Sequence, residues 1–192
     1  APAMMEYFYT QATPNDYFIG ALSGPGYMYP KAVPPALLPP IIRRAAELME
    51  ALDLRVFEIM DYSEGFFHMG TVELPRPIVD AYYENMPNAM AFLNGYGPAN
   101  TFTVRDGRPL LSFDYYIHPS TPEAEVTEDL EELARLNSER PYFLLLHVRN
   151  YADIRRVIRI LEALGEEFEV VAMDEFVKLA AARPTYEERL RE

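Results

Sequence analysis

The sequence has no cysteine, which excludes disulfide bonds, cysteine nucleophiles and thiolate chemistry. The cellular compartment stays open, because many exported proteins also lack cysteine. The sequence also lacks any apolar run as long as a membrane span, so no membrane-spanning segment is expected. Its first residues, APAMM, do not have the basic head and apolar core of a signal peptide. Either the protein is cytoplasmic or the sequence begins downstream of an export signal.

Basic residues are few: 17 Lys and Arg stand against 30 Asp and Glu, giving a formal net charge of −13. Proteins bind the phosphate backbone of nucleic acids through Lys and Arg, and no local basic patch overrides the total. We therefore expect no nucleic-acid partner. The length of 192 residues suits one domain, and the 49% hydrophobic and 24% charged residues are ordinary for a globular one.

The sequence does contain an unusual loop, the heptad GPGYMYP at residues 24–30, directly after the apolar residues 17–22. Its glycines allow backbone angles that other residues resist, whereas its prolines fix φ and prevent a regular strand. If residues 17–22 are a buried strand, the loop lies at a strand's C-terminal end, where α/β folds bind ligands. It presents Tyr27 and Tyr29. The alternative is a rigid turn whose tyrosines pack onto neighbouring helices, and the loop alone favours neither.

The heptad resembles the signature that names the GxGYxYP family of glycoside hydrolases, and residues 12–18, ATPNDYF, resemble that family's lead-in to the motif. The similarity extends from about Tyr9 to residues 174–177, DEFV. This resemblance implies the C-terminal domain of a longer, exported protein that acts on a poly- or oligosaccharide. The implied partners are a carbohydrate and the preceding N-terminal domain of the same protein. The implied fold is barrel-like and related in shape to the polysaccharide deacetylases.

Strand-like and helix-like segments alternate along the chain, which is typical of a parallel sheet with helices outside it. Asp106-Gly107 is a strong hairpin signal, and we expect the second arm of this hairpin to rejoin the sheet near residues 114–116. Five or six β/α units are too few for an eight-unit barrel, so we expect an α/β fold with an incomplete or seven-stranded β/α barrel and a β-hairpin excursion. The expected strands are residues 17–22, 54–60, 89–93, 101–105, 108–113, 142–146 and 168–173. The expected helices are residues 40–52, 75–85, 123–138, about 154–164 and one that begins at 174. At the two ends of the sequence, we expect residues 4–12 to be an edge strand or the end of a linker, and residues 185–192 to form a terminal helical turn.

Polar residues that follow parallel strands gather at one edge of a sheet, and this criterion selects the candidate site. Hydrolysis of a glycosidic bond usually requires two carboxyl groups, one protonated and one ionised. Asp61 and Asp174 are the preferred pair, because each directly follows an expected strand. Asp61 could instead be a turn or cap residue. Asp174 could instead be a helix N-cap, and for Asp174 the N-cap is the favoured interpretation.

Glu58 and His147 are two further candidates for catalysis. Glu58 lies within the expected strand at residues 54–60, where an unpaired charge is costly. It either acts as a catalytic carboxylate or forms a structural ion pair with an arginine, and the ion pair is slightly favoured. His147 has a reference pKa near neutrality, which suits a general acid or base. Its alternative is a histidine hydrogen-bonded at the end of a strand.

The candidate substrate-binding residues combine tyrosine rings, which suit the faces of sugars, with polar groups near strand ends. Arg149 would clamp a carboxylate-bearing sugar or balance Asp61, whereas Asn150 is favoured as a helix cap. Asp16 lies at the opposite end of its strand if that strand begins at residue 17. The set is Asp16, Tyr27, Tyr29, Asn94, Tyr96, Asp114 and Arg149.

Three functions follow from these residues. A glycoside hydrolase predicts Asp61 and another carboxylate facing one cleft, whereas a non-catalytic glycan-binding or structural module predicts tyrosines on a groove without such a pair. A metal-dependent deacetylase predicts a cation near at least two of the three histidines. No His-x-x-x-His pair exists among His68, His118 and His147, so we expect no metal. The heptad lacks the third glycine of the dinucleotide fingerprint, so we expect no nucleotide cofactor either.

Overall fold

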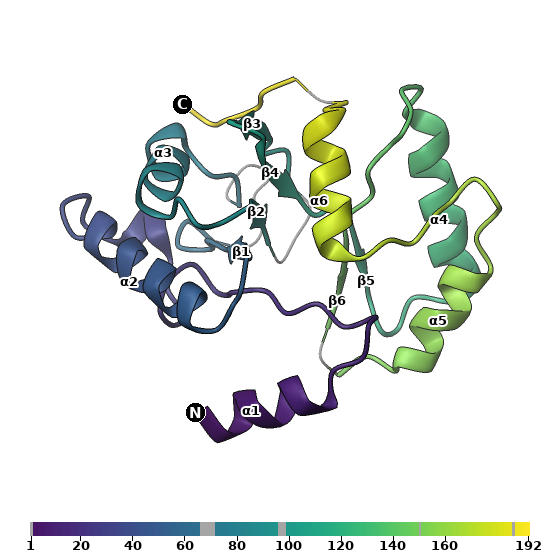
Figure 1. Cartoon of the computed structure of the whole chain (residues 1–192). Coiled ribbons are helices and arrows are strands. Elements are labelled where there is room, and N and C mark those ends of the chain that lie inside the picture. Colours follow the sequence, from purple (N-terminus) through teal and green to yellow (C-terminus); the bar gives the residue numbers. More distant parts are fainter. Residues whose placement is uncertain (1, 66–71, 96–98, 150, 186) are drawn as a thin grey trace.

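The computed structural model describes residues 2–65, 72–95, 99–149, 151–185 and 187–192, which form a mixed α/β structure (Figure 1). Its main sheet has four strands in the order β1-β2-β4-β3. β1, β2 and β4 run parallel, and β3 is antiparallel to β4. Every residue of β1 and β2 is buried, as expected for parallel strands covered on both faces. The bounds are β1 Val56–Ile59, β2 Ala91–Asn94, β3 Thr103–Arg105 and β4 Arg108–Ser112.

The hairpin predicted at Asp106 and Gly107 is confirmed. Arg105 pairs with Arg108 across this two-residue turn, whose φ angles are 51° and 72°. Positive φ at both central residues is what a type I′ turn requires. The second arm, β4, pairs in parallel with β2. It therefore rejoins the sheet earlier than residues 114–116, where we expected it, and Tyr115 and Tyr116 belong to a separate two-stranded sheet.

Two helices, α2 (Leu38–Ala51) and α3 (Arg76–Asn85), pack together on one face of the main sheet (Figure 1). Each has proline in its first turn, where the missing N–H has no helical partner to lose. Their buried side chains, Ile42 and Tyr82 among them, contact Phe57 and Phe92 of the strands. Both helices were predicted from the sequence nearly to their ends, α2 from its apolar period and α3 with proline in its first turn.

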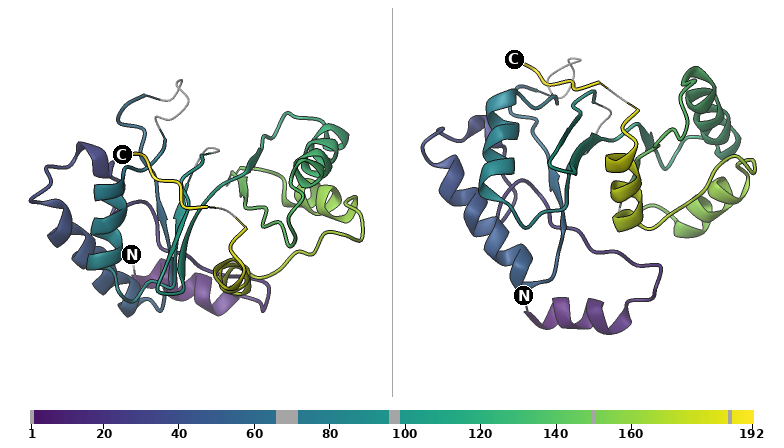
Figure 2. Two further views of the ribbon diagram at one scale, coloured as in Figure 1. Left: turned by 90° about the horizontal axis from the view of Figure 1, so that it is seen from above. Right: turned by 45° about the horizontal axis from the view of Figure 1, so that its top comes forward.

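The opposite face of the main sheet is covered by α6 (Met173–Ala182), which packs Val177 against the strands. Beyond it, β5 (Tyr115–Ile117) and β6 (Leu146–Val148) form a separate two-stranded parallel sheet. α4 (Glu123–Leu136) and α5 (Ile154–Glu162) cover one face of this small sheet. Figure 2 shows the pair α2 and α3 on one side of the molecule and the pair α4 and α5 on the other.

The N-terminal segment departs from the prediction. Pro2–Gln11 form a helix, α1, so the expected edge strand or linker end at residues 4–12 is wrong. Residues 17–22 do run beside β1, but they pair with it only at Gly20, which bridges to Phe57. The backbone of Gly20 donates to the Val56 carbonyl and accepts from the Glu58 N–H, both at 2.8 Å. This segment therefore leads the motif loop to the end of β1.

The C-terminal half contains three corrections. Residues 168–172 form no strand, because their apolar side chains are not covered: Val170 is 71% exposed. β6 begins at Leu146, the last residue of the strand predicted at 142–146. The end of the chain is extended rather than helical, since Arg189 bridges to Phe102 and Arg191 to Pro75.

The two sheets formed by the described residues remain open, and no closed barrel is present among these strands. None of the helices in the described ranges is both long and apolar enough to cross a membrane.

Candidate functional site

The motif loop at residues 24–30 begins from a residue that is fixed on β1. Ser23 is fully buried and adopts a φ of 68°, a conformation uncommon for residues other than glycine. Its hydroxyl both donates to the Met60 carbonyl and accepts from the Met60 N–H, each at 2.8 Å. Its backbone N–H donates to the Glu58 carbonyl, and the Tyr82 hydroxyl donates to its carbonyl. The loop therefore departs from the end of β1 at a defined position.

Asp61 fixes the other end of the motif loop. This residue is 1% exposed, and its carboxylate accepts from the Lys31 backbone N–H at 2.6 Å. It also accepts from the N–H and hydroxyl of Ser63, at 2.9 and 2.6 Å. The Lys31 ammonium lies 3.7 Å from it and 3.1 Å from Glu64. Asp61 thus acts as an anchor for the loop, which agrees with the turn-residue alternative.

The motif tyrosines lie between these two anchors. Tyr27 is 65% exposed and Tyr29 is half-buried. Their rings meet edge to face with centroids 5.5 Å apart, and their hydroxyls are 3.0 Å apart. Because the loop is fixed at both ends of the motif, the pair is held at the carboxyl edge of the main sheet, where β1 and β2 end.

Tyr62, which follows Asp61, lies close to several of the candidates. Burial raises the pKa of its hydroxyl, the charge of Arg149 opposes this, and Tyr27, Glu58 and Tyr29 add to the rise. Since Coulomb effects fall with distance, each of these four groups lies within electrostatic range of Tyr62. We call Glu58, Tyr62, Tyr27, Tyr29 and Arg149 the Tyr62 cluster; the structure brings together four of its members that the sequence selected.

Glu58 supplies the carboxyl group of the Tyr62 cluster. It is 9% exposed, and within the described part of the chain no hydrogen bond or ion pair reaches its carboxyl group. A Cβ on Gly95 would lie 2.0 Å from its Oε1, so any other residue at position 95 would force the Glu58 side chain to move. Burial raises the pKa of Glu58 to about 7. The arginine ion pair that the sequence favoured is therefore not formed.

Arg149, which directly follows β6, relates the Tyr62 cluster to the small sheet, where His147 also lies. His147 is opposite Tyr116 in the β5–β6 register. Its ring contacts those of Phe113 and Tyr116, with centroids at 5.0 and 5.4 Å. Burial lowers the pKa of His147, so the neutral imidazole predominates near pH 7. Arg149 lies over the Tyr116 ring at 5.8 Å, on the face that α4 and α5 leave uncovered.

Asn94 and Asp114 are used to join segments. The Asn94 amide donates to the Val72 carbonyl and to the Thr101 hydroxyl, both at 3.1 Å. Asp114 accepts from the Leu145 N–H at 2.7 Å and from the Tyr142 hydroxyl at 3.1 Å. Burial raises the pKa of Asp114 to about 6. These contacts tie the end of β4 to the approach to β6.

Asp174 and Asp16 lie at the opposite edge of the sheet. Both line a cavity together with Arg55 and Met90, the residues directly before β1 and β2. The predicted pair, Asp61 and Asp174, is therefore separated by the length of the strands. Asp174 lies in the first turn of α6, whose N-cap is Ala172, and pairs with Lys178 at 2.7 Å.

Three of the residues considered from the sequence, Tyr96, His68 and Asn150, lie outside the described residues. The N-cap of α5 is Asp153, whose carboxylate accepts from the Arg155 N–H.

A comparison with protein families matches residues 1–181 to the family described as "GxGYxYP putative glycoside hydrolase C-terminal domain". The chain belongs to this family. The resemblance read from the heptad is thereby confirmed. Neither the curated proteins nor the solved structures that were compared gave a match.

The GxGYxYP signature fixes two glycines, and the structure explains the first. A Cβ on Gly24 would lie 2.3 Å from the Met28 sulfur, so the loop closes tightly here. Gly26 is exposed and does not have a positive φ. Among the described residues, no heavy atom lies within 4 Å of the place its Cβ would occupy. The backbone beside Tyr27 is therefore open to close approach by a ligand.

Sequence reasoning missed Tyr62 and Lys31. Tyr62 directly follows the selected Asp61, and Lys31 directly follows the motif, so their positions in the sequence could have indicated that both belong to the site. The side chain of Lys31 is nevertheless only 7% exposed. Its burial between Asp61 and Glu64 depends on chain segments that are distant in sequence.

Proposed function

We propose that this domain hydrolyses a glycosidic bond with Glu58 as the general acid. The observation that carries this proposal is the carboxyl group of Glu58, which is buried on β1 near Tyr62, where burial raises its pKa to about 7. Glycosidases need a carboxylic acid that stays protonated near neutral pH to donate to the leaving oxygen. Burial, which disfavours the charged form of a carboxyl group, is a physical route to such an acid.

The tyrosines supply a surface for a poly- or oligosaccharide. Tyr27 and Tyr29 present apolar ring area with hydroxyls at its margin, which suits the C–H faces and hydroxyls of sugar rings. The space over Gly26 allows a sugar to approach the backbone. Arg149, over Tyr116, adds a fixed donor that would bind sugar hydroxyls or a sugar carboxylate.

The second catalytic group in this proposal is His147. Its lowered pKa keeps the imidazole neutral at the pH where Glu58 is still protonated, which suits a base that activates water. Asp61 is assigned a positioning role, because its oxygens already accept three hydrogen bonds and face Lys31.

The test is hydrolysis of a glycan panel by the full-length protein and by its variant Glu58→Gln. Loss of the general acid typically costs about 10²–10⁴-fold in rate. Activity of the native protein should fall as pH rises through about 7, because Glu58 then loses the proton it donates. Glu50→Gln, on the exposed side of α2, is the matched control. Full turnover by Glu58→Gln would contradict the assignment.

A non-catalytic glycan-binding or structural module is the second candidate. The observation in its favour is that Asp61 and Asp174 lie at opposite edges of the sheet. Glu58 therefore has no second carboxylate available for catalysis among the described residues of the Tyr62 cluster. This alternative predicts that glycans bind to the full-length protein, that Tyr27→Ala weakens this binding, and that no glycan is cleaved.

A metal-dependent deacetylase has less support. Among the described residues, no group of three or more His, Cys, Asp or Glu side chains could hold a metal ion. The imidazole of His118 is used in a turn, 2.7 Å from the Ser120 hydroxyl. The deacetylase-like barrel, the exported location and the N-terminal partner domain stay predictions that rest on the family.

A further inference from the structure

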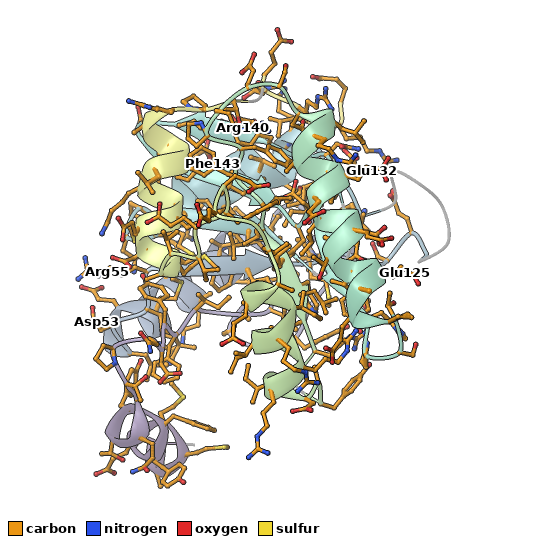
Figure 3. All side chains as sticks on the ribbon, turned by 90° about the vertical axis from the view of Figure 1, so that its right-hand side faces the viewer. Asp53, Arg55, Glu125, Glu132, Arg140 and Phe143 are labelled. Carbon is orange, nitrogen blue, oxygen red and sulfur yellow. The ribbon has the colours of Figure 1, made fainter. Side chains whose placement is uncertain are left out.

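A cavity of about 510 Å³ lies at the amino edge of the main sheet, away from the Tyr62 cluster. Arg55 and Met90, which line it, directly precede β1 and β2. α1 contributes Tyr9 and α6 contributes Lys178 to the same lining. Figure 3 shows Asp53 and Arg55 projecting at this edge, between α6 and α1. We call this cavity the amino-edge pocket; its volume is typical of small-molecule sites.

Three aromatic side chains form part of the lining: Tyr9, Tyr17 and Phe18. The rings of Tyr9 and Phe18 meet edge to face with centroids 5.1 Å apart. The Tyr9 hydroxyl donates to the Leu52 carbonyl, and the Tyr17 hydroxyl lies 3.7 Å from the Met90 sulfur. These contacts hold the rings in place before any ligand arrives, which lowers the entropic cost of binding.

Four charged side chains of the amino-edge pocket form two ion pairs. Asp53 lies 3.2 Å from Arg55, and Asp174 lies 2.7 Å from Lys178. All four are substantially exposed at the rim. Each pair keeps unused lone pairs and N–H groups, so the rim offers hydrogen-bond acceptors beside donors at fixed positions. Neutral hydroxyl groups, which both donate and accept, match such a rim.

Asp16 completes the polar lining and helps to exclude other ligands. Its carboxylate accepts from the N–H and hydroxyl of Thr13, at 2.8 and 2.7 Å. Three carboxylates therefore face two cationic groups, which does not favour a phosphate or another anion. No metal-binding group of three or more His, Cys, Asp or Glu is found within the described ranges, so a bound cation is not favoured either.

The carboxyl groups here also differ from Glu58 in their protonation. Hydrogen bonds from Thr13 lower the pKa of Asp16, and hydrogen bonding to Lys178 lowers that of Asp174. Both are ionised near neutral pH and cannot act as proton donors. A hydrolytic role for this pocket is therefore not supported, although the sequence had selected Asp174 for catalysis and Asp16 for substrate binding.

We propose that the amino-edge pocket is a second, non-catalytic binding site for an uncharged oligosaccharide. The choice of a carbohydrate as the ligand rests on the proposed function. The location of the site rests on the aromatic lining and the paired charges at the rim of the pocket. A site at the far edge of the sheet would hold one part of a long glycan chain while another part occupies the Tyr62 cluster, or would keep the protein on a polysaccharide surface.

The experiment is a titration of the full chain with four uncharged hexasaccharides, the β-1,4-linked oligomers of glucose, xylose, mannose and N-acetylglucosamine. Binding is located by amide NMR shifts and quantified by calorimetry. At least one hexasaccharide should shift amides around Asp53 and Asp174. Lys178→Ala, which removes donors from the rim and keeps a good helix former in α6, should weaken that binding about tenfold, equivalent to roughly 1.4 kcal/mol.

Two variants serve as controls. Arg44→Ala removes a comparable surface pair, Arg44 with Glu47 on α2, and should leave binding unchanged. Glu58→Gln should leave binding at the amino-edge pocket unchanged, whatever it does to hydrolysis, so failure of the pocket and failure of the proposed function are separate results. The proposal is overturned if no hexasaccharide binds at millimolar concentration, if the shifts are confined to the Tyr62 cluster, or if Lys178→Ala binds as tightly as the native protein.

Discussion

The carboxylate of Asp61 accepts a 2.6 Å hydrogen bond from the backbone N–H of Lys31, the residue directly after the GxGYxYP motif. A buried acid at the end of β1 thus fixes the end of a loop located thirty residues earlier in the chain. The bond places Tyr27 and Tyr29 at the carboxyl edge of the sheet. The site therefore depends on Asp61 even though its oxygens are already occupied.

Asp61→Asn should destabilise the protein by about 2–3 kcal/mol. Only one of the two terminal side-chain atoms of asparagine can accept hydrogen bonds, and the variant also loses the negative charge that faces the partly buried ammonium group of Lys31. Urea denaturation measures this loss. Asp106→Asn is the matched control, since asparagine suits the positive φ of the hairpin turn. An Asp61→Asn protein that keeps native stability but loses turnover would favour the catalytic interpretation of Asp61 instead.

Glu58 should make stability depend on pH. Its pKa is raised on folding from 4.5 to about 7, so the folded state binds the proton more tightly. The stabilisation is fully present below about pH 4.5 and is lost as pH rises through 7. A shift of this size corresponds to roughly 3 kcal/mol at most.

We therefore expect Glu58→Gln to gain stability relative to the native protein as pH is raised from 5 to 8. Asp114, whose pKa is raised to about 6, acts in the same direction in both proteins, so the difference between them isolates Glu58. Glu50→Gln provides the baseline. A stability difference that stays constant over this pH range would show that Glu58 is not held protonated.

The two motif glycines should respond differently to alanine. Gly24→Ala forces the Met28 side chain to move and should cost about 1–3 kcal/mol. Gly26→Ala meets open space among the described residues and should change stability by less than about 0.5 kcal/mol. Thermal melts measure both. If a ligand approaches the backbone here, Gly26→Ala lowers glycan affinity while the melting temperature stays constant; unchanged affinity would argue against that approach.

The C-terminal segment, outside the family match, should contribute to stability through Glu188. This carboxylate accepts from the Thr103 hydroxyl and pairs with Arg76 at 3.0 Å. Because the pair is partly exposed, Glu188→Ala should cost only about 0.5–1 kcal/mol. Glu187→Ala, at the exposed neighbouring position, should cost less. Equal melting temperatures for the two variants would contradict a structural role for this segment.

The sequence by itself determined the elements whose signals are local. The apolar period indicated α2, and the proline in its first turn accompanied the prediction of α3. The Asp106-Gly107 pair indicated the hairpin because its backbone angles are specific, and the heptad indicated the family. It failed at α1 and at residues 168–172, where a short apolar or aromatic run has no distinguishing period and only tertiary contacts decide between helix, strand and loop.

Only the tertiary structure decided which candidates meet. Asp61 and Asp174 both stand beside apolar runs in the sequence, but residues 168–172 do not join the sheet, and Asp174 comes to the amino edge instead. The perturbed pKa of Glu58 likewise depends on its surroundings, including the contact with Gly95 from the neighbouring strand's end. Residue type and order specify local conformation, whereas proximity and burial, which set the chemistry of a carboxyl group, arise when distant segments pack together.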